Sequence, residues 1–415
     1  MAASADLPPP SSAALEVSAE LTRVIRAEIR SAGGWLDFAR YMELALYAPG
    51  LGYYSAGSTK LGASGDFVTA PEISGLLGRA LARTLRKELV EMSAPVILEV
   101  GAGSGALAAE MLDALADLRP SYRILEPSAD LRERQRAALA RFGGRVSWLD
   151  RLPERPDAHA VVANEVLDAL PVSRFAKRGG RAVPRGVVER GDGFGWGDGP
   201  ERAALTAAVG ELERELGAPF PDGYESEVAL QLPAWLASVA DALERGCLLL
   251  VDYGLVRREY YHLQRASGTL ICHYRHRAHD DPFFVPGLQD ISAWVDFSAC
   301  ADAARAAGLD VAGFTTQAQF LLATLAAEPA LAAELALTAE PVLTGEPALT
   351  GEPRRAGEPR RAATEVAAFR EASALKTLLL PGEMGERFKV LLLRKRAAGA
   401  PSSNALPGRD LRGWL

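Results

Sequence analysis

The most constraining feature of this sequence is a short apolar stretch that ends in three alternating glycines. Residues 96–100 (VILEV) are too few for a helix, and Gly101, Gly103 and Gly105 follow them at once. A helical pattern resumes over residues 106–112. Glycine permits positive φ and lets the backbone approach a ligand, which then faces the free N–H groups of the helix start. The pattern therefore predicts a strand, a tight turn and a helix that together can hold a ligand.

Two acidic residues sharpen this prediction into a nucleoside site. Glu99 lies two residues before Gly101, and Glu126 closes the next expected strand, 122–125. Glu126 lies about twenty residues beyond the glycines, where a doubly wound sheet places its ribose-binding carboxylate. Without the acids, G-x-G-x-G could be only a close-packed corner between strand and helix. With them, the stretch resembles the first two motifs of class I S-adenosylmethionine (SAM) methyltransferases, which implies SAM as cofactor.

Composition and charge exclude several classes of protein. The chain has 415 residues, of which 48% are hydrophobic, so it can bury a large core. Because uninterrupted apolar runs stay well short of the about eighteen residues of a membrane helix, we expect no membrane insertion. A net charge of -7 argues against a general nucleic-acid binder. Three widely spaced cysteines indicate a reducing compartment without a disulfide framework or zinc knot, and the excess of arginine over lysine favours a bacterial, cytoplasmic protein.

The chain divides by composition into a helical N-terminal part, a core and several inserted segments. We expect helices over 14–32, 38–46, 73–91, 129–142 and 223–243, and further strands over 145–149, 158–163, 247–251, 309–315 and 388–393. The predicted boundaries are a disordered leader 1–13, a helical extension 14–92, a core 93–325 and 365–396, insertions at about 173–235 and 255–297, a disordered hexapeptide-repeat insertion 337–363, and a loose tail 397–415.

Polar residues follow two of the expected core strands. The strand 158–163 leads directly into Asn164, Glu165 and Asp168, and the strand 247–251 leads into Asp252 and Tyr253. Ligands of open α/β sheets bind at the carboxyl ends of the strands, so these side chains are candidates for an acceptor site. The alternative is structural, with Asn164 capping a helix and Glu165 as an ordinary surface acid.

Three further positions leave two interpretations open. Thr69 and Glu72 have the spacing of a capping box, and the small residues before them suit either a ligand loop or a solvent loop with an ordinary cap. Asp150 ends the expected strand 145–149, where a polar side chain often meets the adenine of a nucleoside cofactor. A plain turn explains Asp150 equally well.

The second insertion carries three histidines, at 273, 276 and 279, with acids beside them. On a helix His273 and His276 would share a face and could bind a metal. The preceding residues are strand-like, however, and alternation along a strand would scatter the imidazoles. We therefore favour a loop that supplies polar and cationic groups over the site, with Gln289 and Asp290 following, and we expect no metal.

Four longer motifs resemble the MidA-type methyltransferases, whose mitochondrial members look like protein arginine methyltransferases needed for complex I assembly. The motifs occupy residues 41–54, 65–74, 164–171 and 274–282, and the resemblance covers most of 36–393. It implies an α/β fold: a Rossmann-like, seven-stranded SAM methyltransferase core with a helical N-terminal extension and inserted lid segments. It also implies an arginine of a protein substrate, such as a complex I subunit, as acceptor. Whether the chain is a monomer or a homodimer stays open.

An arginine acceptor needs help from carboxylates, because guanidinium keeps its proton at neutral pH and shares its charge among three nitrogens. A carboxylate can localise that charge and take a proton as methylation proceeds. We assign this role to Glu165 and Asp168, with Asn164 beside them. A non-catalytic SAM-binding assembly factor and a small-molecule methyltransferase remain as alternatives, and the G-x-G-x-G spacing disfavours an NAD-dependent oxidoreductase.

Overall fold

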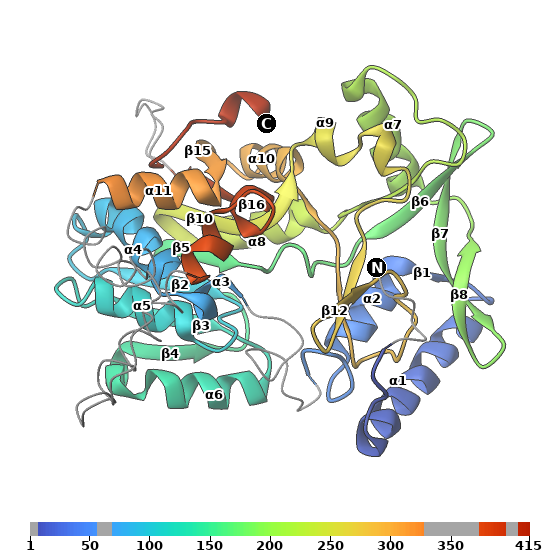
Figure 1. The fold of residues 1–415 in the computed structure, drawn as a ribbon, viewed down its shortest axis with the longest axis horizontal. Coiled ribbons are helices and arrows are strands. Elements are labelled where there is room, and N and C mark those ends of the chain that lie inside the picture. The colour runs from blue at the N-terminus through green and yellow to red at the C-terminus, as the bar shows by residue number, and fades with distance from the viewer. Residues whose placement is uncertain (1–6, 56–68, 328–372, 396–405) are drawn as a thin grey trace, which may run out of the picture.

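The computed structural model describes residues 7–55, 69–327, 373–395 and 406–415, and the molecule is built on one large sheet (Figure 1). Along the sheet the strand order is β15-β16-β10-β5-β2-β3-β4, and β14 attaches to β10. The pairs from β10 to β4 are parallel, whereas β16 runs antiparallel to both β10 and β15. The strands are β2 (Val96–Val100), β3 (Ser121–Leu125), β4 (Val146–Leu149), β5 (Ala158–Asn164), β10 (Leu243–Leu255), β14 (Val295–Asp296), β15 (Asp310–Thr316) and β16 (Phe388–Lys395). The predicted seven-stranded core is confirmed by this path.

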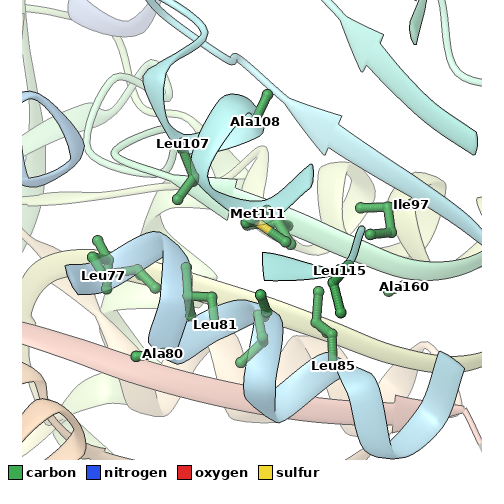
Figure 2. Packing of buried hydrophobic residues seen from close by; sticks show 14 of the residues in the cluster. Leu77, Ala80, Leu81, Leu85, Ile97, Leu107, Ala108, Met111, Leu115 and Ala160 are labelled. Atoms are coloured by element: carbon green, nitrogen blue, oxygen red, sulfur yellow. The ribbon is translucent and has the colours of Figure 1, made fainter. Parts of the chain in front are cut away.

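Helices cover both faces of the sheet because its strands alternate their apolar side chains between two clusters. Ile97 and Leu249 belong to the cluster under α4 and α5, and their neighbours Leu98 and Leu250 belong to the cluster under α8 and α10. Figure 2 shows the first cluster, in which leucines of α4 meet Leu107, Met111 and Leu115 around α5. The helices of the core are α3 (Ala70–Ile73), α4 (Leu76–Leu89), α5 (Ala106–Ala114), α6 (Ala129–Leu139), α8 (Leu232–Ala242), α10 (Phe297–Ala306), α11 (Gln317–Ala326) and α14 (Met384–Arg387).

A second lobe combines the first helices with the two insertions, beside the core in Figure 1. One sheet has the order β1-β7-β6-β9, with β8 paired to β7, and a small sheet has the order β12-β11-β13. Tyr41 joins these parts, because its ring packs against Phe194 and Phe283 while its hydroxyl donates to Pro282 O at 2.6 Å. The elements are α1 (Ser12–Ser31), β1 (Leu36–Asp37), α2 (Phe38–Tyr47), β6 (Ser173–Arg178), β7 (Arg181–Arg190), β8 (Gly193–Asp198), α7 (Ala203–Leu216), β9 (Glu225–Val228), α9 (Arg257–Tyr260), β11 (Ile271–Tyr274), β12 (Arg277–His279) and β13 (Asp290–Ser292).

Two predicted helices are wrong in detail. Residues 225–228 form strand β9, paired with β6, and the helix that we expected from 223 begins only at Leu232. The expected helix 73–91 is interrupted because Ser74 is extended and Gly75 packs against α5. A Cβ on Gly75 would lie 2.4 Å from the carboxyl group of Glu110. Tertiary contacts override the local helical pattern in both places.

Two predicted boundaries also change. The helical extension ends before α4, which packs on the core sheet and so belongs to the core. The tail is not loose over its described part, because Leu406 and Leu411 are buried and Leu411 N–H donates to Phe314 O of β15 at 2.8 Å. The leader residues 1–6, the hexapeptide repeat 337–363 and the rest of the predicted tail lie outside the described residues. Within the described part of the chain, every helix is too short or too polar to cross a membrane.

Candidate functional site

The turn between β2 and α5, which we call the glycine turn (residues 101–105), has backbone geometry that requires glycine. Gly101, Gly103 and Gly105 have φ values of 68°, 53° and 85°. Gly101 N–H donates to Leu125 O at 3.0 Å, which fastens the turn to the end of β3. Since α5 starts directly after Gly105, its free N–H groups open beside the same turn.

The two acids predicted beside the glycine turn are buried and hydrogen-bonded. Glu99 is 1% exposed and accepts from the Tyr122 hydroxyl at 2.8 Å, and burial raises its pKa to about 7. Glu126 accepts from Ser128 N–H at 3.0 Å and from Gln135 Nε2 at 3.1 Å. Both carboxylates are thus held in fixed positions next to the turn.

Gln135 is a site residue that the sequence reasoning missed. Its amide donates to Gly103 O at 2.9 Å as well as to Glu126, so one side chain ties the glycine turn to the end of β3. Gln135 is fully buried on α6. A signal existed, because Leu131, Gln135 and Leu139 are four residues apart and form the buried face of that helix.

The other three predicted cofactor residues lie in two different places: Thr69 and Glu72 at the start of α3, and Asp150 at the exposed end of β4. Thr69 and Glu72 form the capping box of α3, with Thr69 N–H donating to Glu72 Oε2 at 3.4 Å. The next residue, Ala70, donates its N–H to the carboxyl group of Glu165, so α3 begins at the acceptor candidates. The side chain of Asp150 is 87% exposed and pairs with Arg132. It lies at an open hollow of about 520 Å³ formed by residues 148–155.

Glu165 lies in the loop of residues 164–170, which starts at the last residue of β5 and abuts the glycine turn. A Cβ on Gly101 would lie 3.1 Å from Val166 Cγ2. Glu165 has φ 55°, an unusual value for a residue other than glycine, and accepts from Asn164 Nδ2 at 3.2 Å. Burial and the charge of Asp168 raise its pKa to about 8.

Asp252 at the end of β10 holds the 164–170 loop in place. Its Oδ2 accepts from three successive N–H groups, those of Val166 at 3.1 Å, Leu167 at 2.9 Å and Asp168 at 3.3 Å. Burial and the charge of Asp168 raise its pKa well above the usual range. The predicted substrate residue Asp252 therefore contacts the loop backbone and positions the loop.

Asp168 joins Glu165 and Asp252 to a fourth carboxylate, Asp290 of β13. Asp168 Oδ2 accepts from the Tyr253 hydroxyl at 2.6 Å, and burial together with the charge of Asp290 raises the pKa of Asp168 to about 7. Asp290 accepts from Tyr54 at 2.9 Å and from the Ser292 hydroxyl at 2.7 Å. We call Glu165, Asp168, Asp252 and Asp290 the acidic cluster.

The histidine segment is a β-hairpin next to the cluster. His273 on β11 pairs across the strands with Asp290, and its Nδ1 lies 3.9 Å from Asp290 Oδ2. His276 is exposed in the turn with φ 61°, and His279 is buried on β12. Gln289 is fully buried and donates to Asp281 O at 3.1 Å, inside the insertion. Of the predicted lid residues, the structure thus brings His273, Asp290, Asp252 and Tyr253 to the cluster.

Known proteins with similar sequences or structures include methyltransferases. A solved structure from Burkholderia thailandensis, bound to S-adenosyl-homocysteine, is 40% identical, covers 99% of this chain and 100% of its own, and superimposes with a TM-score of 0.83. The mitochondrial protein arginine methyltransferase NDUFAF7 homolog of Drosophila melanogaster is 28% identical over 70% of this chain and 71% of its own. The mitochondrial protein arginine methyltransferase NDUFAF7 of Mus musculus is 29% identical over 67% of this chain and 68% of its own.

A family model for S-adenosyl-L-methionine-dependent methyltransferases matches residues 76–315, more than half of the chain. The match begins at α4 and runs through the glycine turn, the 164–170 loop and β15. The chain belongs to this family of SAM-dependent methyltransferases.

Proposed function

We propose that this enzyme methylates an arginine side chain of a protein and that the acidic cluster receives the guanidinium group. The observation that carries the proposal is the contact between the glycine turn and the 164–170 loop, which carries the half-buried Glu165 and the buried Asp168. The curated relatives named above as arginine methyltransferases support it.

The residues around the glycine turn fit SAM. Carboxylates are the usual partners of ribose hydroxyls in doubly wound sheets, so Glu126 is proposed for that contact and Glu99 for a nearby polar contact. Gly101, Gly103 and Gly105 keep side chains away from the turn, and the free N–H groups of α5 favour a carboxylate of the ligand. When bound, SAM supplies a methyl group activated by its sulfonium. Thr69, Glu72 and Asp150 stay proposed as peripheral contacts.

The acidic cluster fits an arginine side chain because several carboxylates share one buried region. Without a cation, burial and mutual repulsion raise their pKa values. A guanidinium group bound between Glu165 and Asp168 relieves this repulsion and donates to both acids. One of the two carboxylates then takes the proton that the attacking nitrogen loses, while Asn164 orients Glu165.

The narrower parts of the proposal concern partner and compartment. A subunit of respiratory complex I is the proposed acceptor, by resemblance to the MidA-type methyltransferases. A bacterial cytoplasm is the proposed location, supported by arginine usage and by Cys247, Cys272 and Cys300, all buried and free.

The test combines purified enzyme, SAM with an isotopically labelled methyl group and a lysate from cells lacking the enzyme. Mass spectrometry should locate the label on arginine of one protein. The matched control is Glu165→Gln, for which we expect SAM binding to persist by calorimetry while transfer falls by about 100- to 10,000-fold. Label on another type of residue or on a small molecule would refute arginine as acceptor. SAM binding without any label would favour an assembly factor instead.

A further inference from the structure

A second cavity lies behind the 164–170 loop, and we call it the lateral cavity. It measures about 450 Å³, within the range of small-molecule pockets. Leu167 and Leu170 of the loop form part of its wall, and the rest comes from α7, α8, α9, α10, β9, β14 and segments next to them. The lateral cavity is therefore separate from the acidic cluster but shares the loop with it.

The lining of the lateral cavity is strongly acidic. Its carboxyl groups belong to Glu211, Glu215, Glu227, Asp296 and Asp302. Among the residues that the structure describes, its only basic lining residue is Arg257, which already pairs with three of them: Glu215, Asp296 at 3.4 Å and Asp302 at 2.8 Å. The side chains of Glu211 and Asp302 are 61% and 51% exposed, whereas Glu227 is 1% exposed. At the exposed rim Glu211 pairs with Arg214 at 3.7 Å and Asp302 pairs with Arg305 at 3.0 Å, so the charge of the rim is partly compensated. The buried acid of the lining is Glu227, and carboxylates at both depths attract cations.

Glu227 is the residue that points to a ligand. Its Oε1 accepts from Thr269 N–H at 2.5 Å, the Thr269 hydroxyl at 2.6 Å and the Tyr260 hydroxyl at 3.1 Å. Its Oε2 is buried and has no hydrogen-bond partner among the described residues. An unsatisfied buried carboxylate oxygen is costly and calls for a partner. Glu227 is a lining residue of the lateral cavity, and its Oε2 lies against Gly268, where a Cβ would be 2.2 Å away.

Aromatic rings complete the lining. Tyr260, Tyr261 and Trp294 line the cavity beside Leu212 and Leu232. Aromatic faces attract cations, and the leucines suit an aliphatic stem. We propose that the lateral cavity binds a guanidinium or primary ammonium group carried on an aliphatic chain, with Glu227 as its buried anionic partner. The group comes either from a free small molecule or from a basic side chain, and this proposal is independent of which residue the enzyme methylates.

The test measures binding of agmatine, an aliphatic guanidinium, by calorimetry to enzyme saturated with S-adenosyl-homocysteine. We expect Glu227→Gln to weaken the binding of agmatine by at least about tenfold. Ala208→Phe, which fills the cavity from α7 and leaves Glu227 intact, should weaken it as well. Asp168→Asn should weaken any agmatine bound at the acidic cluster and leave binding in the lateral cavity in place. Competition by the tripeptide Gly-Arg-Gly would identify a peptide side chain as a source, and binding of agmatine without such competition would identify a free small molecule.

The proposal is overturned if agmatine fails to bind, or if only Asp168→Asn removes its binding. It is also overturned if both cavity variants bind agmatine like the unaltered enzyme, because Glu227 then only braces Thr269 and Tyr260. Thermal unfolding shows whether each variant is folded. If Glu227→Gln does not fold, Ala208→Phe decides alone. A failure of the arginine-labelling experiment leaves these outcomes unchanged.

Discussion

The glycine turn and the acidic cluster lie side by side but are built in opposite ways. The glycine turn and its acids come from one continuous stretch, residues 96–135, and Tyr122, Ser128 and Gln135 give neutral hydrogen bonds to the carboxylates. The acidic cluster gathers side chains from the 164–170 loop, β10 and β13, with Tyr54 added from the N-terminal part. Burial and neighbouring acids raise the pKa values of Glu165, Asp168 and Asp252. The carboxylates beside the glycine turn already have neutral hydrogen-bond donors, whereas the acidic cluster is electrostatically suited to a cation.

The largest expected effect comes from a substitution in the glycine turn, which should abolish cofactor binding and leave the acidic cluster intact. Gly103→Val should abolish SAM binding while the fold persists, because a branched side chain would enter the cofactor region at a φ of 53°. Calorimetry with SAM and circular dichroism measure the two properties.

Gly179→Val is the matched control, because Gly179 has nearly the same φ, 55°, and a Cβ there would meet nothing within 4 Å. It lies in the turn between β6 and β7, so it carries the backbone strain without approaching the cofactor. Normal SAM affinity in Gly103→Val would contradict the cofactor assignment. Equal loss in Gly179→Val would show that strain alone is responsible.

The same contrast explains what the sequence could predict. The glycine turn was readable because strand, glycines and both acids are close in the chain and obey local rules of geometry. The polar ends of β5 and β10 were also readable, as they follow buried strands. The bond from Tyr54 to Asp290 and the triple acceptance by Asp252 were not, because they join residues 84 or more positions apart. Strand β9 was missed because its pairing with β6 is also non-local, joining for example Ser173 to Val228.

Asp252→Asn should have the next largest effect. An asparagine side chain of the same shape can turn its NH2 toward the three N–H groups, which frees the 164–170 loop. We expect kcat for methyl transfer to fall by about 100-fold, since a small displacement of reacting groups is costly. SAM affinity should change little, because Asp252 does not contact the glycine turn in any hydrogen bond described above.

Asp222→Asn is the matched control for this variant. Asp222 also accepts two backbone N–H groups, from Gly179 at 3.0 Å and Gly180 at 2.9 Å, but in an exposed part of the second lobe. The kcat of the Asp222→Asn variant should stay near that of the unaltered enzyme. If Asp252→Asn keeps full kcat, Asp252 does not position the loop.

The pH dependence of stability tests the electrostatic half of the comparison. Glu165 and Asp168 have pKa values of about 8 and about 7, above the ordinary 4.5 and 3.8. At these two groups the folded protein holds protons that the unfolded chain has released, so their contribution to stability is full below the ordinary pKa values and is lost as pH rises to about 8. We expect the free energy of unfolding to fall as pH rises through about 8, and Glu165→Gln to reduce that fall. Urea unfolding between pH 5 and pH 9 measures the free energy of unfolding of both proteins. An identical dependence on pH in the unaltered enzyme and in Glu165→Gln would refute this prediction.

The smallest expected effects come from removing single hydroxyls, one in each region. Tyr54→Phe removes the bond to Asp290, and Tyr122→Phe removes the bond to Glu99. Each substitution removes about one hydrogen bond, so we expect the affected KM to change by about three- to tenfold. Tyr54→Phe should raise KM for the acceptor protein and spare SAM, because Asp290 belongs to the acidic cluster. Tyr122→Phe should weaken SAM and spare the acceptor. Steady-state kinetics with each reactant varied in turn separates the two, and a variant that changes both KM values equally would show that the two regions act as one unit.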